Sequence, residues 1–138
     1  MSQSRKKSSG AAAVRNRLVK QNNTMQLKGV RNQNMSLMKA LSRCKPSSFN
    51  KTIKANGRMQ QRQIRAQNMS LSRTLKRSGL GTSDVKKRMK IQINADKRQN
   101  NELINAVKAN PSSWRKAVKK RMNMQLKAVS AQNKAIMS

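Results

Sequence analysis

The sequence has no histidine and no tyrosine, and it has one residue each of cysteine, tryptophan and phenylalanine. Without histidine, the chain lacks the side chain that most often moves protons near neutral pH. A single cysteine cannot form an intrachain disulfide, and without histidine it cannot complete a zinc site. We therefore expect a protein that is not an enzyme and that holds no metal and no cofactor.

Acidic residues are almost as scarce, because Asp84, Asp96 and Glu102 stand against 33 lysines and arginines. Three carboxylates offer little material for a calcium site or for a catalytic carboxylate pair. The formal charge is +30 over 138 residues, and such a charge repels itself strongly. We expect the free chain to be marginally stable until an anionic partner neutralises it.

Long hydrophobic runs are also missing. No stretch approaches the roughly 18 apolar residues of a membrane span, and the polar, basic start does not resemble a signal peptide. The sequence therefore predicts no membrane association.

One pattern that is present recurs about every 33 residues, a period typical of stacked helical units. Each copy has a Gln preceded by Met or Ile, a branched residue six positions before that Met or Ile, and a Lys directly after the branched residue. A Gln-Asn pair begins eight positions after the Met or Ile. The Met/Ile-Gln pairs are Met25-Gln26, Met59-Gln60, Ile91-Gln92 and Met124-Gln125, and the Gln-Asn pairs begin at Gln33, Gln67, Gln99 and Gln132.

This pattern divides the chain into a basic arm over residues 1–10 and four units over residues 11–45, 46–80, 81–110 and 111–138. Pro46, Pro111 and Gly79-Leu80-Gly81 mark the turns between units, each followed by Ser or Thr that could cap a helix. Helix-favouring residues dominate between the turns. We predict an all-α fold of four tandem basic repeats of about 33 residues, extended or loosely packed, with a disordered arm. Each unit is either one long helix or two shorter helices; we prefer the former.

Cations repeat with the unit. Lys20, Lys54, Lys86 and Lys119 occupy one position, and Lys28, Arg62 and Lys127 occupy another, eight residues later and near the same helix face. Such a ladder suits a polymer with regularly spaced phosphates. The predicted nucleic-acid-binding residues are Lys20, Lys28, Lys54, Arg62, Lys86, Lys87, Arg88, Lys119, Lys120, Arg121 and Lys127.

Other repeated positions are assigned to structure. We expect the Gln-Asn pairs to bridge or cap helices, with contacts to nucleic acid as the alternative. We expect the methionines to fill the core, with a pliable protein-binding surface as the alternative. Phe49 and Trp114 share a repeat position and are assigned to the core, and Cys44 is given no role.

Together these features predict a non-enzymatic, largely sequence-independent protein that neutralises and packages DNA or structured RNA, of the chromatin, nucleoid or viral-core type. The alternative is a structural ribonucleoprotein component, such as a ribosomal protein or an mRNA-export adaptor, that binds RNA and also a protein through Met/Leu-rich helix faces. The expected location is the nucleus, with a virion or ribonucleoprotein particle as the alternative. The sequence leaves open the choice of DNA or RNA and the oligomeric state.

Overall fold

The computed structural model describes residues 2–137, with side chains from Gly10 onward. Over this range the chain is all-helical and forms four long helices: α1 (Ser2–Arg43), α2 (Phe49–Arg77), α3 (Ser83–Ala109) and α4 (Trp114–Ile136). Two short 3₁₀ turns, η1 (Pro46–Ser48) and η2 (Pro111–Ser113), precede α2 and α4. The all-α prediction is confirmed.

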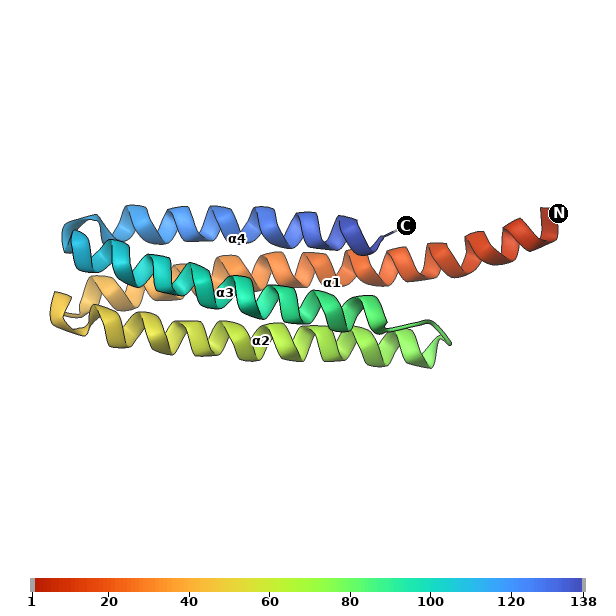
Figure 1. Cartoon of the computed structure of the whole chain (residues 1–138), viewed down its shortest axis with the longest axis horizontal. Helices are drawn as coiled ribbons and strands as arrows, with labels where there is room; N and C mark the ends of the chain where they lie inside the picture. Colours follow the sequence, from red (N-terminus) through yellow and green to blue (C-terminus); the bar gives the residue numbers. More distant parts are fainter. Residues whose placement is uncertain (1, 138) are drawn as a thin grey trace.

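The four helices lie side by side and alternate in direction (Figure 1). Each helix packs against two neighbours, so that α1 meets α2 and α4, and α3 meets α2 and α4. The pairs α1/α3 and α2/α4 therefore lie across the diagonals of a four-helix bundle. This packing corrects the prediction of an extended or loosely packed array.

Each predicted unit contributes one uninterrupted helix, although Gly29 and Gly57 lie inside α1 and α2. Both glycines mark close approaches between helices. A Cβ atom on Gly29 would meet the Gln63 side chain at 2.6 Å, and one on Gly57 would meet Asn100 at 2.5 Å. Glycine fits these positions because the space of a side chain is already occupied.

The basic arm over residues 1–10 was predicted to be disordered, but it is helical from Ser2 onward, where α1 begins. At 42 residues α1 is longer than the other three helices, and its N-terminal turns extend past the end of the bundle (Figure 1). Residue 1 lies outside the described range. No proline between Ser2 and Gly10 interrupts the helix in this segment.

The turns fall where Pro and Gly predicted them. Gly79 has φ of +72°, the left-handed conformation that ends α2. The N–H of Leu80 then donates to the Leu75 carbonyl at 2.8 Å, and the N–H of Gly79 donates to the Lys76 carbonyl at 3.0 Å. The N-cap residues of α2, α3 and α4 are Ser48, Thr82 and Ser113, as the Ser and Thr pattern predicted. None of their side chains forms a capping hydrogen bond, so that part of the prediction is wrong.

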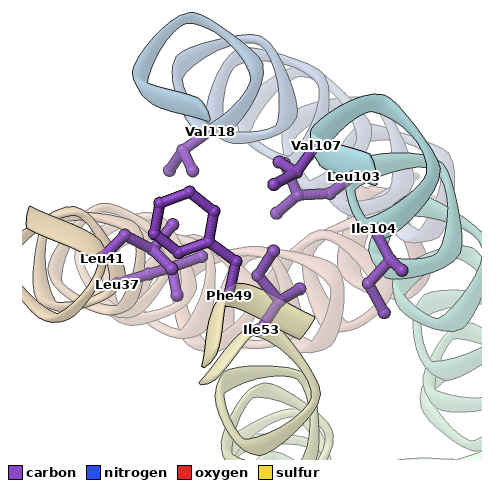
Figure 2. Packing of buried hydrophobic residues seen from close by; sticks show 8 residues of the cluster. All are labelled: Leu37, Leu41, Phe49, Ile53, Leu103, Ile104, Val107 and Val118. Atoms are coloured by element: carbon purple, nitrogen blue, oxygen red, sulfur yellow. The ribbon is translucent and has the colours of Figure 1, made fainter. Parts of the chain in front are cut away.

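Two apolar clusters close the two ends of the bundle. At the end with turns η1 and η2, Phe49 packs among aliphatic side chains from all four helices (Figure 2). Its ring lies 6.2 Å from that of Trp114, at 57°, so both aromatic residues contribute to the core as predicted. The members of this first apolar cluster are Leu37, Leu41, Phe49, Ile53, Leu103, Ile104, Val107 and Val118.

The second apolar cluster lies at the end with the α2–α3 turn and contains Val19, Leu71, Leu75 and Val85. The four branched repeat residues are all fully buried, Val19 and Val85 in this cluster and Ile53 and Val118 in the first. The four residues divide between the two ends because neighbouring helices are antiparallel. The same repeat position therefore lies at one end of the bundle in α1 and α3 and at the other end in α2 and α4.

Most methionines do not fill this core, and that prediction is wrong for Met25, Met35, Met59, Met69 and Met124. The first four are each 56% exposed. The middle of the bundle is occupied by polar side chains that hydrogen-bond to one another. Met38 and Met137, by contrast, are partly buried and pack against the first and second apolar clusters.

Candidate nucleic-acid interface

The outer surface carries nearly all of the predicted cations. Lys20, Lys54, Lys86 and Lys119 each follow a fully buried branched residue, and each is exposed. One residue along a helix corresponds to a rotation of about 100°, which takes the side chain from the core to the surface. Five other predicted residues are also exposed: Lys28, Arg62, Lys87, Lys120 and Lys127.

These cations do not form a ladder on one face. Lys20 and Lys86 adjoin residues of the second apolar cluster, whereas Lys54 and Lys119 adjoin residues of the first. The members of each pair lie on diagonally placed helices, so they point away from each other. The bundle therefore presents positive charge on all sides.

Anionic side chains barely interrupt this surface. In the described part of the chain the one salt bridge joins Arg15 Nη2 to Asp84 at 2.8 Å. Arg15 also donates to the carbonyl of Ile136 and so connects α1 with the ends of α3 and α4. Of the other two acids, Glu102 is exposed and Asp96 is buried.

Arg88 and Arg121 are the two predicted binding residues that the structure places elsewhere. They are only 2% and 3% exposed, so their expected position on the surface is wrong. Each guanidinium group instead lies in the core and donates to asparagine side-chain oxygens from the three other helices.

The Arg88 cluster consists of Arg88, Asn22, Asn68 and Asn133. Arg88 donates from Nε and Nη2 to Asn68 Oδ1, at 2.9 and 2.7 Å, and from Nη2 to Asn22 Oδ1 at 2.7 Å. Its Nη1 donates to Asn133 Oδ1. Burial lowers the pKa of Arg88 to about 10, because removal from water disfavours the charged form. The asparagine oxygens replace the lost water.

The Arg121 cluster repeats this arrangement with Arg121, Asn34, Asn56 and Asn100. Arg121 donates from Nε and Nη2 to Asn34 Oδ1, from Nη2 to Asn56 Oδ1 at 2.7 Å, and from Nη1 to Asn100 Oδ1. Burial again lowers the pKa of the arginine to about 10, here opposed by the charge of Asp96.

Between the two clusters lies a glutamine layer of Gln26, Gln60, Gln92 and Gln125. Gln26 and Gln92 exchange two amide hydrogen bonds across one diagonal, at 3.0 and 3.2 Å. Gln60 and Gln125 do the same across the other, both at 3.1 Å. The layer also adjoins a small cavity of about 40 Å³, lined largely by glutamines. The bundle thus has apolar ends and a polar middle.

Asp96 is the one acid in this middle. Its carboxylate accepts hydrogen bonds from Asn100 and from Gln125, both at 3.0 Å. Burial raises the pKa of Asp96 to about 6, although the charge of Arg121 and the hydrogen bonds from Gln61 and Asn100 oppose the increase. Arg88 has no comparable acidic neighbour in the described residues.

The Gln-Asn pairs are assigned to structure correctly, because the asparagine of every pair is buried in an arginine cluster. Asn22 and Asn56, which occupy the repeat position of Arg88 and Arg121, were not predicted to be part of the core. A signal for them exists in the sequence, because Val19, Asn22 and Gln26 are spaced as a buried helix face. That face is recognised only when polar residues are considered together with apolar ones.

No helix in the described range is both long and apolar enough to cross a membrane. The same residues contain no group of three or more metal-ligating side chains. Comparison of the chain with protein-family models, with curated proteins and with solved structures finds no match.

Proposed function

We propose that this protein is a non-enzymatic, largely sequence-independent nucleic-acid-binding protein that neutralises and packages DNA or structured RNA. The supporting observation is the distribution of charge: nine predicted cations are exposed on a bundle whose surface carries few acids. Phosphate neutralisation by lysine and arginine releases condensed counterions, and this favours binding without reference to base sequence.

Packaging is favoured over the coating of one strand because the cations surround the bundle. Lys20 on α1 and Lys86 on α3 lie on diagonal helices, so two nucleic-acid segments can bind on opposite sides of the bundle. A helix such as α2, with 29 residues, is roughly 43 Å long at about 1.5 Å per residue. One molecule therefore offers a rod that can lie between two segments and bring them together.

The repeated sequence units are part of the proposal. Each unit supplies one helix that places a lysine next to a buried branched residue, so the outward cations are built four times from one pattern. The setting that suits this activity is chromatin in the nucleus, a nucleoid or a viral core.

A structural ribonucleoprotein component is the second candidate, and the exposed methionines favour it. Met25, Met35, Met59 and Met69 lie on the outer surface of α1 and α2, where a flexible apolar side chain can contact a protein partner. Purification from cells at low salt, followed by nuclease treatment, separates the two candidates. A protein complex that survives nuclease favours this alternative, and its disappearance favours the packaging protein.

The main experiment is a parallel titration of the full chain with duplex DNA, duplex RNA and single strands of matched length at two salt concentrations. We expect binding to both duplexes, with log K falling by roughly 0.9 for each phosphate neutralised on duplex DNA as log[salt] rises. A binding constant that is insensitive to salt, or confined to one base sequence, contradicts the proposal.

A further inference from the structure

A groove lies between α2 and α3. It has a volume of about 310 Å³ and receives side chains from both helices. The residues that could contact a guest are Lys54, Arg58 and Gln61 of α2 and Lys97 and Asn101 of α3.

Gly57 lies on the wall of this groove and contributes no side chain to it. The same repeat position holds Asn23, Met89 and Met122 in the other three units. A Cβ atom at Gly57 would lie 2.5 Å from Nδ2 of the buried Asn100, so a larger residue here would force the Asn100 side chain to shift. The glycine therefore allows the two walls of the groove to approach each other.

Three cations and no carboxylate line this groove. Lys54 and Arg58 are one helical turn apart and therefore neighbours on α2, and Lys97 reaches the groove from α3. All three are exposed, and within the described residues their side chains form no ion pair. Their mutual repulsion is relieved when an anion enters between them.

Two other inter-helix grooves lack this combination. The hollow between α3 and α4 includes Glu102 beside Lys120 and the buried Arg121. The hollow between α1 and α2 has no charged residue in its lining. The α2/α3 groove is thus the one of these three in which cations from two helices converge without an acid.

We infer that the α2/α3 groove is a binding site for a phosphodiester group of a nucleic-acid strand. Lys54, Arg58 and Lys97 neutralise the phosphate, and the side-chain amides of Gln61 and Asn101 donate to its oxygens or to the adjoining sugar. This inference rests on the proposed function and adds a preferred point of contact to a surface that is otherwise cationic on all sides.

The test compares two variants with the same reduction in charge. The groove variant carries Lys54→Gln, Arg58→Gln and Lys97→Gln. The control carries Arg73→Gln, Lys76→Gln and Lys90→Gln, which remove two lysines and one arginine from exposed positions on the same two helices, outside the groove. Circular dichroism first establishes that both variants remain helical.

Binding of a labelled DNA duplex of about 20 base pairs is then measured at several salt concentrations. We expect the groove variant to weaken binding at least tenfold more than the control does, and to lower the salt slope by about 0.9 for each phosphate that it no longer neutralises. Equal weakening by the two variants overturns the groove site but leaves the proposed function intact. Failure of the unmodified chain to bind any duplex overturns the proposed function itself.

A second arm replaces chloride by inorganic phosphate at constant ionic strength. If the groove recognises a phosphate group, millimolar phosphate reduces duplex binding by the unmodified chain more than by the groove variant. An equal reduction in both proteins contradicts the inference. A duplex that still binds far more tightly than inorganic phosphate identifies the nucleic-acid backbone as the guest, whereas equal affinity contradicts that choice.

Discussion

Arg121 donates two hydrogen bonds to a single oxygen of Asn34, from Nε at 2.9 Å and from Nη2 at 2.8 Å. Asn34 in turn donates to the Val30 carbonyl at 2.8 Å and to Gln125 at 2.9 Å. An apolar side chain at position 34 could therefore not take over its role. Arg88 and Asn68 have the same relationship at the other end of the polar middle.

The first prediction concerns this pair. Asn34→Ala leaves the buried guanidinium of Arg121 without two of its hydrogen bonds, so we expect the free energy of unfolding to fall by about 3 kcal/mol. The measurement is urea unfolding followed by circular dichroism. Asn32→Ala, an exposed change on the same helix, is the control and should alter stability by less than about 0.5 kcal/mol. Similar midpoints for the two variants would show that the cluster is not formed.

The second prediction concerns pH. Because burial raises the pKa of Asp96 to about 6, the folded state holds its proton more tightly than the unfolded chain, whose aspartate pKa is about 4. The resulting stabilisation is fully present below about pH 4 and is lost as the pH rises through about 6. We expect the bundle to be about 2 kcal/mol more stable toward urea at pH 4 than at pH 7.

Asp96→Val should remove this pH dependence. Val30, Ile64 and Val129 occupy the equivalent position in the other units, so valine fits the repeat pattern. Asn100 then donates to the backbone carbonyl of residue 96, as Asn34 does to Val30. Glu102→Gln serves as the control and should keep the pH profile. A profile that stays steep in the Asp96 variant assigns the effect to another group.

The third prediction concerns the exposed methionines. Met25, Met35, Met59 and Met69 should be oxidised to sulfoxides by dilute hydrogen peroxide before the less exposed Met38, Met89 and Met122. Peptide mass spectrometry over a time course measures the order. Because the exposed group lies outside the core, the helical circular dichroism should not change while only those residues are oxidised. Early oxidation of Met38 would indicate that the bundle opens.

The fourth prediction concerns the repeated lysines. Substitution of Lys20, Lys54, Lys86 and Lys119 by glutamine should weaken binding by a similar factor on every duplex sequence, since the contacts are to phosphates. Titration of several unrelated duplexes at one salt concentration measures this. Weakening on a single sequence would reveal recognition of base edges.

The fifth prediction concerns packaging. Two duplexes, one labelled with a donor dye and the other with an acceptor, should show energy transfer when the protein is added at low salt, because cations on diagonal helices bind separate segments. The signal should disappear at high salt as the phosphate contacts are screened. Tight binding without energy transfer would mean that the protein coats one segment and does not bridge two.

Local sequence patterns were sufficient for the helices, their turns and much of the surface. Pro46, Pro111 and Gly79 end or begin helices through their own backbone preferences, which depend on no distant partner. The spacing of Val19, Ile53, Val85 and Val118 identified the buried face, and the lysine after each was correctly placed outside.

Only the tertiary structure decided which polar residues are inside. Arg88 and Arg121 resemble the neighbouring Lys87 and Lys120 in sequence, yet they are buried because three asparagines from other helices supply acceptors for each guanidinium. A charged side chain can leave water only where such partners replace it. Those partners come from residues 20 to 87 positions away in the sequence. Because such contacts join distant residues, the sequence could not show that the units pack into a bundle and leave most of the methionines outside.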